Sequence, residues 1–141
     1  MNILKILTRE RLVGNFGEDE AAKFLKRRGF RIVKRNYVAG GGEIDIIAAN
    51  REFLLFVEVK TRAADGDSRL EMRPASAVTP EKQRKIIGAA SHFPTYLYPE
   101  RKLRFDVVEV YYAEIGKKRK VTKIEHLEGA FTKSSAYRPR G

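Results

Sequence analysis

The sequence predicts an α/β protein in which helices cover both faces of a mixed sheet, with elements in the order αβββαβ. Two segments with helical spacing of apolar residues, 13–28 and from 79 onward, flank three runs rich in β-branched and aromatic residues, at 31–38, 43–49 and 53–61. The last two runs carry apolar residues at both alternating sets of positions, which is typical of strands buried on two faces. This order of helices and strands indicates a layered α/β fold.

The chain is basic and of single-domain length. It has 141 residues, a formal net charge of +11 and 43% hydrophobic residues, which suffices for one buried core. The absence of cysteine excludes disulfides and thiolate metal sites. The excess positive charge favours a polyanionic partner. We expect an N-terminal extension at 1–12, a single domain at 13–128 and a flexible basic tail at 129–141.

The hydrophobic segments are too short to anchor the chain in a membrane. No run approaches the roughly 20 apolar residues of a membrane-spanning helix. Residues 3–7 are too few and too charged to form the apolar region of a signal peptide. We therefore expect a cytoplasmic protein without membrane contact. An exposed edge strand of the sheet could pair with the same strand of a second copy, so a homodimer is compatible with the sequence.

The first four elements have clear boundaries. Phe16, Ala21, Phe24 and Leu25 form the apolar stripe of the first helix, which Gly29 ends. A strand at 31–38 stops at the glycines of 40–42. The runs 43–49 and 53–61 are separated only by the polar residues 50–52, which predicts an antiparallel hairpin. Residues 63–76 read as a polar loop.

The second half begins with a helix start signal. Thr79 is a good N-cap, Pro80 suits the first turn and Glu81 complements the helix dipole, while Pro94 ends the helix. An alternating strand follows at 103–111. The basic residues 117–120 read as a hairpin tip, 121–127 as a final strand, and the chain is expected to lose regular structure from Gly129.

Charged residues interrupt the two most hydrophobic strands. Glu43 and Asp45 share one face of the first strand, and Glu58 and Lys60 share one face of the second. A hairpin loop with an even number of residues places Asp45 on the same face as Glu58, whereas an odd number separates them. We expect the even loop.

Two adjacent carboxylates in a buried setting indicate a divalent cation. They repel each other by roughly 4 kcal/mol at 4 Å and an effective dielectric of 20, and a cation between them reverses that cost. Oxygen ligands without His or Cys favour Mg²⁺ or Mn²⁺. Lys60 could then orient or deprotonate a water and stabilise charge on a phosphate. The alternative is that Lys60 forms an ordinary salt bridge with Glu43 or Glu58.

A third acid could join from the first helix. Glu20 is four residues from both Phe16 and Phe24, so we expect it at the rim of the buried helix face, within reach of the sheet. Alternatively, Glu20 only compensates the helix dipole.

Several of these segments together resemble the YraN family of small bacterial proteins. The resemblance runs from about residue 14 to 110 and rests on Gly17-Glu18, Glu20-Ala21-Ala22, Gly42-Glu43-Ile44-Asp45-Ile46-Ile47, Phe56-Val57-Glu58-Val59-Lys60-Thr61-Arg62 and Ala77-Val78-Thr79-Pro80-Glu81-Lys82-Gln83. That family is similar to PD-(D/E)XK nucleases, close to Holliday-junction resolvases, with a restriction-endonuclease-like fold. A proline that the superfamily has before its aspartate is replaced by Ile44 here.

The resemblance implies specific roles. Asp45 and Glu58 would ligate the metal together with the backbone carbonyl of Val59, and Lys60 would serve the attacking water. Glu20 would be a further acid and possible ligand, and Gln83 would face the substrate or the site.

Other charged residues are candidates for supporting roles. Arg62, Lys82, Arg84 and Lys85 could contact nucleic-acid phosphates, although solvated helix charge is an equal alternative. Glu43 and Asp106 are candidates to contact and orient the metal ligands. Alternatively, Asp106, which lies inside a predicted strand, accepts backbone hydrogen bonds.

Two functions are compatible with these features. The first is a divalent-metal-dependent DNA endonuclease acting on branched or structured DNA, a substrate that the resemblance alone implies. The second is a nucleic-acid-binding or scaffolding protein that keeps the fold but cuts weakly or not at all.

Overall fold

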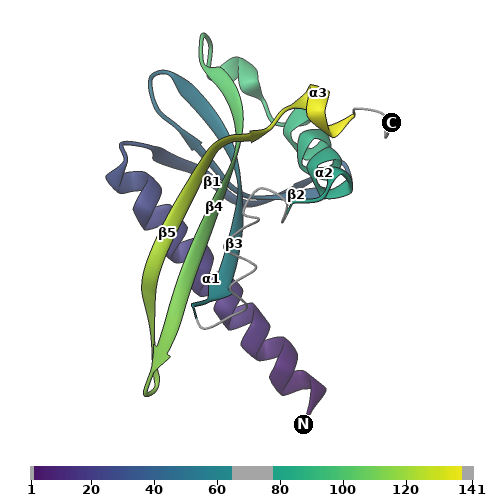
Figure 1. The fold of residues 1–141 in the computed structure, drawn as a ribbon. Coiled ribbons are helices and arrows are strands. Elements are labelled where there is room, and N and C mark those ends of the chain that lie inside the picture. Colours follow the sequence, from purple (N-terminus) through teal and green to yellow (C-terminus); the bar gives the residue numbers. More distant parts are fainter. Residues whose placement is uncertain (1, 65–77, 138–141) are drawn as a thin grey trace.

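The computed structural model describes residues 2–64 and 78–137 and has the expected α/β architecture (Figure 1). The elements are α1 (Ile3–Arg27), β1 (Arg31–Ala39), β2 (Gly42–Ala49), β3 (Phe53–Ala63), α2 (Pro80–Ser91), the 3₁₀ turn η3 (Thr95–Leu97), β4 (Lys102–Ile115), β5 (Lys118–Phe131) and α3 (Lys133–Ala136). The predicted fold class is confirmed. In the described part of the chain, no helix is long and apolar enough to cross a membrane.

The sheet is mixed, with β3 in its centre. Its strand order is β1-β2-β3-β4-β5, in which β3 and β4 run parallel and the other neighbours antiparallel. Parallel neighbours need a crossover connection, and α2 belongs to the connection between β3 and β4. This topology is consistent with a restriction-endonuclease-like core.

A separate apolar layer lies on each face of the sheet. On one face, Ala21 and Leu25 of α1 pack with Ile46, Leu55 and Val108 of the strands. On the other face, α2 covers a second cluster that includes Ile86, Ile87, Ala90, Ile47, Leu54, Phe56 and Val107. The strand side chains alternate between the layers, which explains why β2 and β3 are apolar at both sets of positions.

The turn between β2 and β3 sets the register of the hairpin. Ala49 pairs with Leu54 and Ile46 with Val57, and the Asn50 N–H donates to the carbonyl of Phe53 at 3.0 Å, so two residues, Arg51 and Glu52, lie between the last facing positions of the hairpin. Asn50 stabilises it, because its side-chain oxygen accepts hydrogen bonds from the N–H groups of Glu52 (2.9 Å) and Phe53 (2.7 Å). The prediction of an even loop is confirmed.

The first helix begins at Ile3, not near residue 13. Asn2 caps it, since the Asn2 side chain accepts a hydrogen bond from the Leu4 N–H at 2.9 Å. Residues 3–12 therefore continue α1, and this part of the helix projects beyond the sheet (Figure 1). Few of its side chains are covered: Ile3 is 68% exposed and Leu7 54%.

The C-terminal segment is also more ordered than the sequence predicts. The strand β5 pairs with β4 as far as Phe131, and the short helix α3 follows with a capping box at Thr132. Phe131 and Ala136 are buried in the α2-side core, which holds this segment in place. The expected loss of structure from Gly129 is therefore wrong for residues 129–137. The remaining tail at 138–141, and all of the expected polar loop beyond residue 64, lie outside the described residues.

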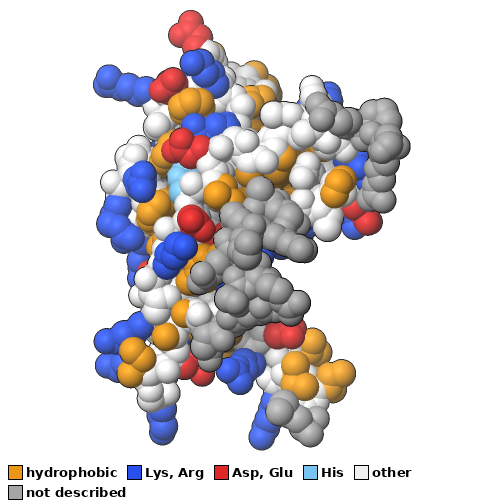
Figure 2. Space-filling model, in the orientation of Figure 1, with side chains coloured by type: hydrophobic (Ala, Val, Ile, Leu, Met, Phe, Trp, Pro, Cys, Tyr) orange, Lys and Arg blue, Asp and Glu red, His pale blue; other side chains and the backbone are white. Residues whose placement is uncertain are grey.

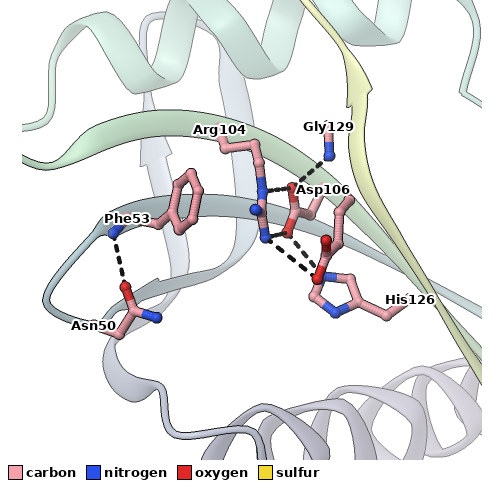
Figure 3. Close-up of polar contacts among 7 residues, drawn as sticks. Asn50, Phe53, Arg104, Asp106, His126 and Gly129 are labelled. Carbon is pink, nitrogen blue, oxygen red and sulfur yellow. Dashed lines mark hydrogen bonds and ion pairs between the residues drawn. The ribbon is translucent and has the colours of Figure 1, made fainter.

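Asp106 has a structural role where β4 meets β5. Its carboxylate accepts hydrogen bonds from Arg104 Nε (2.8 Å) and the Gly129 N–H (2.9 Å) and lies 2.7 Å from His126 Nε2 (Figure 3). These contacts bridge the β-bulge at 105–107. Burial alone would raise the pKa of Asp106, but the hydrogen bonds with His126 and Arg104 outweigh it and lower that pKa.

Close packing of α1 on β3 requires a glycine at position 17. A β-carbon there would collide with the Thr61 side chain, whereas a β-carbon at Gly14, one turn earlier, would meet no atom within 4 Å. We predict that Gly17→Ala destabilises the protein by roughly 1–3 kcal/mol through overpacking. Gly14→Ala, the matched control, should stabilise it by about 0.5–1 kcal/mol through helix propensity. Urea denaturation measures both, and a stabilising Gly17→Ala would contradict this packing.

Candidate active site

A buried pair of carboxyl groups lies where β2 and β3 meet. Asp45 Oδ2 accepts a hydrogen bond from the Val59 N–H at 2.8 Å, which ties the end of β2 to β3. Ile46 pairs with Val57, so Asp45 and Glu58 are the next positions that face each other across the two strands, and their carboxyls are close enough to interact electrostatically. Glu58 is only 4% exposed. The hairpin register thus brings together the two acids that the sequence analysis paired.

The electrostatics of this pair favour a bound proton. Burial is the main cause that raises the pKa of Asp45 to about 8, and the nearby charge of Glu58 raises it further. The hydrogen bond from Val59 opposes this shift in part. At neutral pH the Asp45 carboxyl therefore holds a proton, which a cation bound at that carboxyl would displace.

The oxygen atoms of this pair fit a hard divalent cation. Glu58 Oε2 is buried and has no hydrogen-bond partner within the described residues. Carboxylate oxygens and a neighbouring backbone carbonyl are the donors that Mg²⁺ and Mn²⁺ prefer. However, residues 2–64 and 78–137 contain no cluster of three or more acidic, His or Cys side chains arranged to hold a metal. Water and substrate oxygens would therefore have to complete the coordination.

Two lysines face the same carboxylate. Lys60 Nζ lies 3.4 Å from Glu58 Oε1 and Lys82 Nζ lies 3.8 Å from the same oxygen. Lys60 comes from β3, on the sheet face shared with Glu58, and Lys82 reaches across from α2. Both side chains are partly exposed, at 30% and 43%, so they contact solvent as well as Glu58. The ion pair that the sequence analysis named as the alternative for Lys60 is present.

The acid that α1 directs toward the site is Glu18. Asp45 and Glu58 are both close enough to Glu18 to interact electrostatically with it. The Asn36 amide, oriented with its nitrogen toward the acids, donates to Glu18 Oε1 at 2.9 Å and Glu43 Oε1 at 3.2 Å. Asn36 adopts a positive φ of 53°, a conformation that asparagine tolerates better than most residues. Glu43 thus adjoins the site through Asn36 and Glu18.

Glu20 lies on the other side of α1. Its carboxylate pairs with Lys23 at 3.5 Å. Phe16 and Phe24, the residues one turn on either side, contact Tyr112 of β4 and His126 of β5. Being flanked by Phe16 and Phe24 therefore places Glu20 toward β4 and β5, away from the acids of β2 and β3. Glu18 is not flanked by apolar residues one turn away on both sides, so the periodicity of the sequence did not select it. Only its position next to Gly17, which packs closely on β3, could have indicated that Glu18 faces the site.

Most of the other predicted contact residues already have partners. Arg62 Nε lies 3.4 Å from the buried Glu109, whose Oε2 also accepts a hydrogen bond from Tyr111 at 2.6 Å. Gln83 Nε2 donates to the Val78 carbonyl at 2.9 Å, so its amide supports the start of α2.

The remaining predicted contact residues also have protein partners. Arg84 donates to the carbonyl of Ala136 at 3.0 Å, and Lys85 pairs with Glu81 at 3.8 Å on the surface. Asp106 is on the α1 side of the sheet, in the cluster of Figure 3, and does not contact the Asp45 pair. Among these candidates, only Lys82 adjoins the acids.

The chain is an α/β protein with a five-stranded mixed sheet, consistent with a restriction-endonuclease-like core, and with an acidic pair where β2 and β3 cease to pair. The model of the uncharacterised protein family UPF0102 matches residues 17–110, and the chain belongs to that family. A UPF0102 protein of Chlorobium phaeobacteroides (strain BS1) is 43% identical over 121 residues, covering 84% of this chain and 93% of the relative. One of Herminiimonas arsenicoxydans is 38% identical over 103 residues, covering 73% and 80%.

The acidic pair generates a pH-dependent prediction. Because the folded-state pKa of Asp45 is about 8 and its ordinary value is 3.8, its contribution to stability is full below pH 3.8 and declines as the pH rises toward 8. We predict that Asp45→Asn raises the free energy of unfolding at pH 8 in EDTA by at least about 1 kcal/mol, and that this gain vanishes near pH 4.

Asp106→Asn is the control, and it should change the free energy of unfolding at pH 8 in the opposite direction. The pKa of Asp106 is lowered, so its contribution is present at neutral pH and is lost as the pH falls through the folded-state value. Its substitution should cost roughly 3–5 kcal/mol at pH 8, because it breaks a buried charged cluster. Thermal melts of the three proteins between pH 4 and 8 measure both effects. An Asp45→Asn protein that is less stable than wild type at pH 8 would disprove the raised pKa of Asp45.

Proposed function

We propose that this protein is a divalent-metal-dependent DNA endonuclease that hydrolyses phosphodiester bonds, preferentially in branched or structured DNA. The observation that carries the proposal is the buried pair of carboxyls, Asp45 and Glu58, with Lys60 3.4 Å from Glu58. Burying two carboxyls is costly unless they are paired or bind a cation, so their presence at the surface end of a central hairpin favours a chemical role.

The acids and one carbonyl would hold the cation. Asp45, Glu58 and the Val59 backbone carbonyl are the donors, and Glu18 lies close enough to contribute charge. Bound there, Mg²⁺ or Mn²⁺ would act as a Lewis acid on the scissile phosphate and lower the pKa of water. Asp45 is fixed by its hydrogen bond from Val59, which orients its carboxylate without help from the substrate.

Lys60 would orient the attacking water, and Lys82 would bind a phosphate of the substrate. Lys60 is held next to Glu58 and is partly open to solvent, so its ammonium can orient the attacking water and stabilise charge that develops on the phosphate. Lys82 adds a second positive charge from α2 and would bind a phosphate of the substrate. The net charge of +11 supports attraction of nucleic acid to the whole molecule.

A cleavage assay tests the proposed activity directly. Labelled four-way junction, flap, single-stranded and linear duplex DNA are incubated with Mg²⁺, Mn²⁺ or EDTA. We predict metal-dependent cutting by the wild type that falls by at least about 100-fold in Asp45→Asn and in Lys60→Ala. Lys102→Ala, which removes an exposed lysine paired with Glu52, is the control and should cut normally. If the wild type binds DNA but leaves every substrate intact, the protein is a binding module with this fold.

The position of Glu18 generates a second functional prediction. Glu18→Gln should reduce the cleavage rate by about 10- to 100-fold, the usual effect of losing a residue that supports metal ligands. Glu20→Gln should cut within about twofold of wild type, because Glu20 faces β4 and β5. The two variants make the same chemical change two residues apart on α1. The reverse order of activities would show that Glu20 is the helix acid of the site.

A further inference from the structure

We propose that the groove between the N-terminal half of α1 and the end of β3 binds an unpaired strand of the DNA substrate and leads it to Lys60. This inference rests on the proposed function, and it adds the form of DNA that the site recognises. The groove has a volume of about 950 Å³ and is lined by the first half of α1, by residues 59–61 of β3 and by Tyr112 of β4.

The groove adjoins the candidate active site directly. Val59, Lys60 and Thr61 of β3 form one of its walls. Val59 is the residue whose N–H binds Asp45, and Lys60 is paired with Glu58. A strand lying in the groove would therefore run along the α1 face of β3 and reach Lys60, the residue that pairs with Glu58.

The composition of the groove matches nucleic-acid chemistry with exposed bases. Three cations, Lys5, Arg9 and Lys60, line it against the single acid Glu10, which provides charge complementarity to phosphates. The apolar side chains of Ile6 and Val13 lie among them, together with the aromatic ring of Tyr112. Basic grooves with apolar and aromatic surface are typical of single-strand binding, where bases contact the protein through their faces.

A double helix would not use this surface. In duplex DNA the faces of the bases are stacked on one another, so only phosphates, sugars and groove edges are accessible. The apolar part of the groove would then remain uncovered. An unpaired strand uses both the cations and the apolar side chains, so the groove favours substrates with a single-stranded branch or end.

Positive charge continues from the groove to the β4–β5 hairpin. Arg9 also lines a neighbouring hollow of about 320 Å³ with Glu114, Gly116, Lys117, Lys118 and Arg119. Arg9 pairs there with Glu114 at 3.2 Å, which holds the helix and the hairpin together. Figure 2 shows Lys and Arg side chains on both lower projections of the molecule, which are the start of α1 and the hairpin tip in Figure 1. Phosphates outside the groove would contact these residues.

The experiment compares two identical substitutions on opposite sides of one helix. Ile6 lines the groove and is 39% exposed, whereas Leu4 is 67% exposed and is not among the lining residues. The two positions differ by roughly 200° around the helix. Ile6→Glu and Leu4→Glu therefore change net charge equally, in residues that contribute little to the core, but only the first places a carboxylate in the groove.

Affinity is measured in EDTA by fluorescence anisotropy, with a labelled oligo-dT and a labelled blunt duplex hairpin. We expect Ile6→Glu to weaken oligo-dT binding by about tenfold, and to change duplex binding by no more than Leu4→Glu does. Equal losses in the two variants, equal losses on the two probes, or no binding of oligo-dT by the wild type would overturn the inference. So would a wild-type dimer that Ile6→Glu converts to a monomer with unchanged oligo-dT affinity, because a second copy of the chain would then occupy the groove.

Cleavage of a duplex with a single-stranded tail, in Mg²⁺, separates this inference from the proposed activity. If Ile6→Glu loses oligo-dT affinity but the wild type never cuts, the groove is correct and the endonuclease proposal fails. If the wild type cuts and Ile6→Glu cuts and binds oligo-dT equally well, the activity is correct and the groove assignment fails.

Discussion

The burial of β3 on both faces is the constraint on which the rest of the structure depends. Its first half, from Leu54 to Val57, is enclosed by α1 on one side and α2 on the other. Its second half carries Glu58, Lys60 and Arg62, each of which has a charged partner. The α2-facing side of the strand thus changes from core to polar site after Phe56, while α1 continues to cover Val59 and Thr61 on the other face and the parallel pairing to β4 is unbroken.

This arrangement gives the acids an environment that neither strand provides alone. Asp45 belongs to β2, but its carboxylate is fixed by the Val59 N–H of β3, and burial against Glu58 raises its pKa to about 8. The lysines compensate only one oxygen of Glu58, and the other lacks a hydrogen-bond partner within the described residues. In the proposed function, a cation bound at the pair would displace the proton that Asp45 holds.

The parts of the chain that extend beyond the sheet place further positive charge around this site. The start of α1 and the β4–β5 hairpin are joined by the Arg9–Glu114 ion pair. Both carry basic residues, and the groove between α1 and β3 has an apolar component as well. In the proposed function, the acidic site would act on phosphates and the neighbouring groove would contact bases.

The sequence by itself determined the order of the main elements and the double burial of β2 and β3, and it reduced the meeting of Asp45 with Glu58 to a choice between an even and an odd hairpin loop. These depend on local periodicity and on the polar turn at Asn50, and both signals are short-range. Tertiary structure alone decided which acid of α1 faces the site, because this depends on how the helix is rotated against Thr61 at Gly17. The partner of Arg62 and the sheet face of Asp106 were likewise decided by strands distant in sequence. Contacts between such strands leave no periodic signal in the chain, because each depends on the register of a neighbour.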